Sequence, residues 1–304
     1  MKTSLQNLLL VFVVSSAAGL AAQPVAAAAP APSTPPSTKA DAVPPGIQYA
    51  PASQKTPLGT TFVDWDSLAV RITPSGQSRS VFDNPTPVLE KFEMHITTLN
   101  GGMTSHAPHH HAWEEMLLVK EGEVEVSING KLLRGGPGAL IFYASNDVHN
   151  VKNASADKPA TYYVMNFYTD LVHTTADKPA AEQAVPGKLP SGVIDCNSLP
   201  PTPTPTGSRV TVVNSPTLTF PMLGSHITTL NVGQTTMADM IDSGDELFIV
   251  KSGTLEVKVN GVTARMKEGS FFYCAPNDKR TLKNIGTTPA SYHVIKILSA
   301  KSPK

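Results

Sequence analysis

The chain has 304 residues, enough for two domains with separate hydrophobic cores. Lys and Arg together number 24, as do Asp and Glu, so the formal net charge is zero. A balanced charge gives no net attraction for nucleic acid or an anionic membrane surface, and both are excluded as expected partners. With 27 Pro, 21 Gly and only 16% charged residues, the composition favours an all-β fold with many turns over a helical bundle.

Residues 1–28 have the pattern of a secretory signal peptide. Lys2 gives a short positive start, an apolar run extends from Leu8 to Leu20, and small residues follow as cleavage positions. A transmembrane anchor is the alternative, but the run is shorter than the roughly 20 residues that span a bilayer. We therefore expect a secreted or periplasmic protein with no membrane attachment after cleavage. Residues 29–55 are rich in Pro, Ala and Ser and predict a disordered linker.

The rest of the chain repeats itself after 131 positions. The string HITTLN occupies residues 95–100 and again residues 226–231. The same shift relates FVDWDSL at residues 62–68 to VIDCNSL at residues 193–199. A period this long exceeds a solenoid unit and gives each copy the size of a domain.

Each copy consists of short segments rich in β-branched and aliphatic residues, and none after the signal has a convincing helical period. Asn129-Gly130 and Asn260-Gly261 are hairpin turn signals, because both residue types tolerate a positive φ. The sequence predicts two antiparallel β-domains, at residues 56–178 and 187–304, joined by a linker at residues 179–186.

The stretch HHHAWEE at residues 109–115 carries the most distinctive chemistry. Side chains alternate faces along a strand, so His109, His111, Trp113 and Glu115 are expected on one side. His149 follows in a later strand, where it can face this group across a barrel. Three imidazoles and a carboxylate suit a divalent ion such as Mn, Fe, Zn, Cu or Ni. The alternative is a surface run of imidazoles that binds metal adventitiously.

These segments resemble the two sequence motifs of the cupin family. Residues 102–122 resemble the first motif, and residues 138–153, with Asn153 as the closing residue, resemble the second. The resemblance implies two tandem double-stranded β-helix barrels of the jelly-roll type, which makes the fold class all-β. It also implies that the first barrel binds one metal ion through four ligands: His109, His111, Glu115 and His149.

Three positions of the chain depart from the cupin motifs. The first motif's Gly102 stands one residue further from the first His than the pattern prefers, and Ala144 and Asn146 replace the usual Pro and Gly of the second. All three are turn positions, and Asn also adopts the left-handed conformation.

Other polar side chains near the motifs are not expected to bind the metal. We expect His106 at the rim, and His110 and Glu114 facing away from the metal. A structural role is expected for the two residues that recur in both repeats: His95 and His226.

The second repeat has lost the ligand set. Its corresponding residues are, in order, Met240, Asp242, Glu246 and Arg280. We expect no transition metal there, and an ion pair of Arg280 with Glu246 or Asp242. The second repeat is then either a degenerate scaffold domain or an emptied pocket in which Arg280 binds a carboxylate.

Two cysteines occur, both in the second repeat. Cys196 stands where the first repeat has Trp65, and Cys274 where it has Tyr143. If that aromatic pair is in contact, a disulfide between Cys196 and Cys274 can replace it, and an exported protein can form one. The alternative is two unpaired thiols.

A two-barrel cupin with this ligand set resembles oxalate decarboxylases, germin-like proteins and quercetin dioxygenases. This favours a metal-dependent enzyme, an oxidoreductase of the dioxygenase type or a decarboxylase, acting on a small oxygenated compound. Trp113, Met103 and Phe142 are candidates for the substrate pocket or for plain core, and no catalytic residue is assigned. A non-catalytic sensor or storage protein is the rival, and an amidohydrolase or isomerase is a third reading. The oligomeric state is open, with a homo-oligomer as one option.

Overall fold

The computed structural model describes residues 56–173 and 185–303, and this part of the chain is built almost entirely of β-strands. The predicted signal peptide and first linker, and most of the linker between the repeats, lie outside the described residues. In the described part of the chain, no helix is long and apolar enough to span a bilayer. The prediction of an all-β fold is confirmed.

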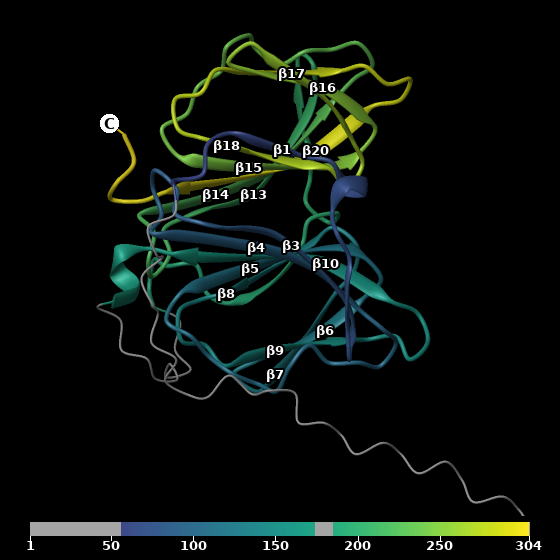
Figure 1. Cartoon of the computed structure of the whole chain (residues 1–304), viewed down its shortest axis with the longest axis vertical. Coiled ribbons are helices and arrows are strands. Elements are labelled where there is room, and N and C mark those ends of the chain that lie inside the picture. The colour runs from purple at the N-terminus through teal and green to yellow at the C-terminus, as the bar shows by residue number, and fades with distance from the viewer. Residues whose placement is uncertain (1–55, 174–184, 304) are drawn as a thin grey trace, which may run out of the picture. The chain divides into compact units, whose positions relative to one another are not determined.

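The strands follow the internal repeat (Figure 1). The first repeat contains β1 (Thr61–Val63), β2 (Arg71–Thr73), β3 (Gly76–Asn84), β4 (Lys91–Leu99), β5 (Glu114–Glu121), β6 (Val124–Ile128), β7 (Lys131–Gly135), β8 (Ala139–Tyr143), β9 (His149–Asn153) and β10 (Ala160–Tyr168). The second repeat contains β11 (Gly192–Asp195), β12 (Thr202–Thr204), β13 (Gly207–Ser215), β14 (Met222–Leu230), β15 (Asp245–Ser252), β16 (Thr254–Val259), β17 (Val262–Lys267), β18 (Phe271–Cys274), β19 (Arg280–Asn284) and β20 (Ala290–Leu298). Two short 3-10 helices, η1 (Trp65–Ser67) and η2 (Asp170–His173), complete the described elements.

Each barrel is formed by a seven-stranded and a three-stranded antiparallel sheet. In the first barrel the strand orders are β11-β8-β5-β10-β4-β3-β2 and β7-β6-β9. In the second they are β1-β18-β15-β20-β14-β13-β12 and β17-β16-β19. The hairpin turns are those predicted, since Asn129 and Asn260 have φ values of 47° and 48° and are followed by glycines with positive φ.

The two repeats exchange their first strands. β1 pairs with β18 of the second barrel, with Thr61 opposite Tyr273, and β11 pairs with β8 of the first, with Gly192 opposite Phe142. Each repeat therefore contributes one strand to the other barrel, and every other strand pairs only with strands of its own repeat. The domain bounds at residues 56–178 and 187–304 stay a prediction.

Alternation along the strands divides the apolar residues between two environments. Leu117, Ile141 and Val164 belong to the interior of the first barrel, which has its own core. Their neighbours Met116 and Phe142 face the opposite way, into a core that both large sheets share. The strand β10 is buried on both faces along its whole length for this reason.

Two buried carboxylates connect the repeats in a symmetric manner. Glu114 accepts hydrogen bonds from the hydroxyl of Thr217 at 2.5 Å and from the backbone amide of Leu218 at 3.0 Å. At the corresponding positions, Asp245 accepts a hydrogen bond from the hydroxyl of Thr86. Glu114 thus faces away from the predicted metal ligands, as expected.

The predicted disulfide is absent, and both cysteines are free and buried. The strand exchange explains why. Cys196 follows β11 and lies with the first barrel, whereas Cys274 ends β18 in the second barrel. Trp65 likewise follows β1 onto the second barrel, so it does not contact Tyr143 of β8. The premise of an aromatic pair replaced by two thiols is therefore wrong.

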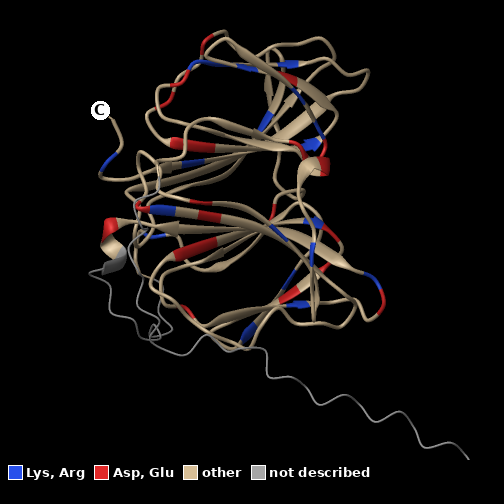
Figure 2. Ribbon diagram, in the orientation of Figure 1, with Lys and Arg blue, Asp and Glu red and all other residues tan. Residues whose placement is uncertain are grey.

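Charged residues of both signs are distributed over both sets of strands (Figure 2). This agrees with the balanced count of 24 basic and 24 acidic residues.

Candidate metal centre

Two segments far apart in sequence, residues 109–115 and the start of β9, bring the predicted ligands together in the first barrel. His149 is the first residue of β9, and a two-way backbone bridge joins it to His109, with N to O distances of 3.1 and 2.8 Å. Glu115 is the second residue of β5 and His111 precedes that strand by three positions. The strand begins only at Glu114, so the predicted alternation does not extend back to His109, although the ligands still converge.

The four side chains form a compact cluster. One ring nitrogen from each of His109, His111 and His149 lies within 4.8 Å of the other two. The Glu115 Oε2 atom lies 3.2 Å from His111 Nε2 and 3.8 Å from His149 Nε2. His111, Glu115 and His149 are buried, and His109 is half-buried. The structure therefore brings together all four residues that the sequence predicts as ligands.

Backbone carbonyls fix the orientation of two of the imidazoles. His111 Nδ1 lies 2.8 Å from the carbonyl oxygen of Trp113, and His149 Nδ1 lies 2.8 Å from that of Asp147. A carbonyl oxygen only accepts hydrogen bonds, so each Nδ1 carries the proton and each Nε2 presents a lone pair. Both lone pairs face the carboxylate of Glu115. Two lone pairs directed at an anion repel it unless a cation lies between them.

The protonation states favour binding of a cation. Burial, together with the neighbouring imidazoles, lowers the pKa of His109 to about 3 and also lowers that of His111. Burial alone raises the pKa of Glu115, but the adjacent rings of His111 and His149 outweigh it and bring this pKa well below its ordinary value. Neutral imidazoles and an ionised carboxylate are the forms in which these residues bind metals.

Trp113 contacts the cluster from one side. Its ring stacks on that of His111, with centroids 4.1 Å apart and planes 6° apart, and also on Tyr168. Its indole N–H donates to the side-chain oxygen of Asn166 at 3.0 Å. Asn166 in turn donates to Glu93 at 2.6 Å. Trp113 thus contacts the ligand cluster and holds the His111 ring in place, while its role in a substrate pocket stays a prediction.

Glu93 and His95 form a polar pair inside the first barrel that sequence reasoning missed. Glu93 lies opposite Asn166 and Asn166 opposite Glu115, so the three side chains share the inner face. His95 Nδ1 lies 2.8 Å from Glu93 Oε1. Burial lowers the pKa of His95, but the hydrogen bond to Glu93 and the nearby charges of Glu93 and Glu115 raise it overall. The alternation of Glu93, His95 and Thr97 along β4 was a usable signal.

The other candidates lie elsewhere. Phe142 is buried in the core between the barrels rather than in a pocket, because its neighbour Tyr143 takes the inward position and stacks on His149 at 4.1 Å. Met103 is exposed in the loop after β4. His106 is half-buried with its ring 4.0 Å from that of His109, which agrees with a place at the rim. His110 is not part of the cluster.

In the second barrel the corresponding side chains form ion pairs. Arg280 and Glu246 are both buried and lie 2.6 Å apart. Asp242 pairs instead with Lys296, at 2.7 Å. The predicted ion pair of Arg280 is therefore confirmed with Glu246 as its partner.

Comparison with known proteins identifies the family. The model of the cupin domain matches residues 95–166 and 226–296, one match in each repeat. Both repeats are cupin domains, and the chain belongs to the two-barrel cupins. No curated protein sequence gives a significant match.

Solved structures with two cupin barrels share the fold. A putative glyoxylate-induced protein from Pseudomonas aeruginosa has a TM-score of 0.63 at 14% identity, covering 84% of this chain and 93% of that chain. Oxalate decarboxylase from Lactobacillus farciminis has a TM-score of 0.60 at 13% identity, covering 82% and 88%. Salicylate 1,2-dioxygenase from Pseudoaminobacter salicylatoxidans has a TM-score of 0.54 at 18% identity, covering 69% and 70%. At sequence identities this low, the TM-scores establish a common fold and nothing more.

Proposed function

We propose that the first barrel binds one divalent transition metal through His109, His111, Glu115 and His149, and that the protein is a metal-dependent enzyme. The observation that carries the proposal is the pair of Nε2 lone pairs, on His111 and His149, directed at the same carboxylate oxygen. Hydrogen bonds from Nδ1 to backbone carbonyls are the usual second partners of metal-ligating histidines. The buried Nε2 atom of His149 has no hydrogen-bond partner among the described residues, so its lone pair is available to a cation.

The donor set suits Mn, Fe, Zn, Cu or Ni. Held by these four residues, such an ion would supply Lewis-acid chemistry toward a small oxygenated substrate or dioxygen. The reaction class that we propose is oxidation of the dioxygenase type or decarboxylation. The similar structures of an oxalate decarboxylase and a salicylate dioxygenase support this class, because both reactions occur on the same fold.

The chain's own residues would perform two tasks around the ion. Trp113 and Tyr143 stack on His111 and His149 and limit the motion of these rings. The Glu93–His95 pair can hold a proton at His95 Nδ1, inside the barrel and within electrostatic range of Glu115. It is the titratable pair best placed for proton transfer at this site.

Metal analysis tests the binding site. We expect about one ion per chain in the purified protein, and loss of that ion when His149→Ala and Glu115→Ala are combined. His110→Ala is the matched control, because it removes a neighbouring imidazole that lies outside the cluster. An unchanged metal content in the double variant would contradict the proposal. An equal loss of metal in the His110→Ala control would indicate adventitious binding by the histidine run.

Turnover separates an enzyme from a binding protein. Protein loaded with Mn, Fe, Zn or Ni would be assayed for oxygen uptake and carbon dioxide release with oxalate, flavonols, diketones and sugar acids. We expect turnover with at least one metal and substrate class, abolished in the double variant. Metal binding without turnover across the panel would instead favour a sensor or storage protein.

We also propose that the protein is exported, to a periplasm or out of the cell, on the pattern of residues 1–28. Mass determination of the mature protein from its native host tests this. Cleavage between residues 21 and 28 is expected, and a chain that retains Met1 and Lys2 would contradict export.

A further inference from the structure

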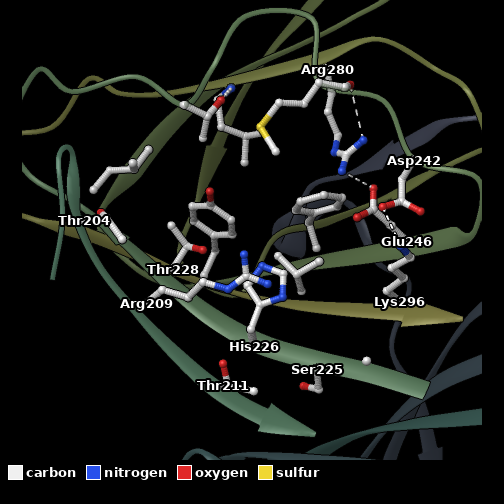
Figure 3. A pocket seen from close by; sticks show the side chains of 18 of the residues that line it. Thr204, Arg209, Thr211, Ser225, His226, Thr228, Asp242, Glu246, Arg280 and Lys296 are labelled. Carbon is white, nitrogen blue, oxygen red and sulfur yellow. Dashed lines mark hydrogen bonds and ion pairs between the residues drawn. The ribbon is translucent and has the colours of Figure 1, made fainter. Parts of the chain in front are cut away.

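The second barrel contains a cavity of about 510 Å³ where the first has its metal ligands (Figure 3). It is lined by residues of β13, β14, β15, β19 and β20 and by the loop that leads to β15. Cavities of roughly 300–1,000 Å³ are the size of small-molecule binding sites.

Specific replacements between the repeats account for this cavity. Glu93 of β4 becomes Gly224 in β14, so the side chain that lies beside Asn166 in the first barrel has no counterpart. A Cβ at Gly224 would meet only Lys296, at distances of 3.6 Å and more, so the space beside this glycine is open. The ligand positions are occupied by the two ion pairs, Arg280–Glu246 and Lys296–Asp242.

Arg209 adds a cation that has no carboxylate partner. It occupies the position of Ser78 in the first repeat and lies opposite Thr228, on the inner face of the sheet. Among the described residues, no hydrogen bond or ion pair involves its guanidinium. Figure 3 shows Arg209 and His226 side by side and pointing into the cavity.

The charges around the cavity do not cancel. Three cationic side chains, Arg209, Arg280 and Lys296, face two carboxylates, Asp242 and Glu246. Burial raises the pKa of Glu246 to about 7, which further reduces the negative charge. Burial and the three cations lower the pKa of His226 to about 4, so it is neutral at pH 7 and offers a hydrogen bond. The cavity thus has an excess of about one positive charge.

Five apolar side chains line part of the cavity: Leu230, Phe248, Leu282, Val294 and Met240. Hydroxyl-bearing residues, among them Thr211 and Thr228, line the rest. An unpaired guanidinium near these apolar side chains favours an anion that carries a hydrocarbon body, because the carboxylate pairs with the charge and the hydrocarbon covers the apolar part of the wall.

We propose that the second barrel is a metal-free binding site for a small organic monocarboxylate with an aromatic or branched aliphatic body, anchored by Arg209. The site is independent of the proposed metal centre, since no residue belongs to both. It gives the repeat without the ligand set a function other than support of the first barrel.

Isothermal titration calorimetry on the full-length mature protein tests the proposal with phenylacetate, 3-phenylpropionate and 4-methylpentanoate. Phenylacetamide is the neutral counterpart, and inorganic phosphate is the anion without a body. At least one carboxylate is expected to bind saturably with a 1:1 stoichiometry, and at least tenfold more tightly than either comparison compound. Arg209→Met is expected to weaken this binding at least tenfold. Gly224→Leu, which fills the open space, is expected to abolish it.

Arg265→Met is the matched control, because Arg265 is exposed on β17, does not line the cavity and removes the same charge. Melting temperatures verify that each variant is folded. No saturable binding of any carboxylate, equal binding of phenylacetamide or phosphate, or binding unchanged by Arg209→Met would each overturn the proposal. A carboxylate that binds the metal of the first barrel would be recognised by its insensitivity to Arg209→Met and its loss in the His149→Ala and Glu115→Ala double variant.

Discussion

At His111 and His149, one hydrogen bond decides the chemistry of each ring. Because the backbone carbonyls of Trp113 and Asp147 accept from Nδ1, the opposite nitrogen is free to bind a cation. The Asp147 carbonyl lies at the end of a turn that begins at Ala144, and the Trp113 carbonyl lies in a bend directly before β5. Asn146, with a φ of 67°, makes the turn possible, since Asn adopts the left-handed region more readily than most residues.

Replacement of Trp113 by Leu is expected to weaken metal binding by roughly tenfold to a hundredfold, the usual effect of losing a group that orients a ligand. The substitution removes the stack on His111 and the hydrogen bond to Asn166. Competition with a chelator of known affinity measures the change. Trp113→Phe retains an aromatic ring and should recover most of the affinity; equal affinities of the wild type and the Leu variant would show that the stack does not orient His111.

The sequence predicted the four ligands because the cupin motifs place them at fixed spacings. It did not predict the inner partners Glu93 and Asn166, which lie on different strands and meet only when β4, β10 and β5 pair. Phe142 was assigned to the pocket because apolar residues in a fully buried strand look alike in sequence. Only the pairing of β8 with β5 distinguishes the inward Tyr143 from the outward Phe142.

At the scale of elements, the exchange of β1 and β11 has the largest consequence. Each strand adds an edge to the sheet of the other barrel. Local sequence predicts that such segments are extended, but it carries no information on which barrel they join. The disulfide hypothesis failed at this point, because it assumed that each repeat folds entirely on itself.

The thiols give a direct check of the exchange. Burial raises the pKa of Cys196 to about 11 and that of Cys274 to about 12, so both are protonated and shielded at neutral pH. We expect slow or no reaction with a thiol reagent in the native protein, and two reactive thiols per chain after unfolding without reductant. The mass should not change on reduction. A gain of two mass units on reduction would instead establish an intramolecular bridge and contradict the strand assignment.

At the scale of the whole molecule, two buried carboxylates related by the repeat connect the barrels. Burial raises the pKa of Glu114 to about 7 and that of Asp245 to about 6, although the hydrogen bonds they accept lower both. The ordinary values are 4.5 and 3.8. The folded state therefore holds these protons more tightly than the unfolded state does, and stability from this source is present below pH 4.5 and lost as the pH rises through 7.

Glu114→Gln removes this pH dependence at one of the two positions. Relative to the wild type, the variant should gain on the order of 3 kcal/mol in unfolding free energy between pH 4.5 and pH 8, because Gln stays neutral. Urea unfolding at a series of pH values measures the difference. Glu125→Gln, at a residue of the outer hairpin on β6, is the control and should follow the wild type. Parallel curves for wild type and Glu114→Gln would show that Glu114 is already ionised in the folded protein.

Most of the fold was predictable because the internal repeat and the strand patterns are encoded locally. The cavity of the second barrel was not, since it depends on Gly224, whose significance emerges only when β14 is placed beside β20. The same holds for Arg209, which faces inward, whereas Arg79, the residue after its counterpart Ser78, lies over Trp65.

The reciprocal placement of β1 and β11 also bears on ancestry. A single copy of this repeat, lending its first strand to an identical twin, would form a two-fold symmetric homodimer with the same sheets. Joining two such genes end to end preserves every strand pair while freeing each half to mutate separately. One descendant could then keep its imidazoles while the other replaced them with Arg280 and Asp242, and neither change would disturb the interlocked framework.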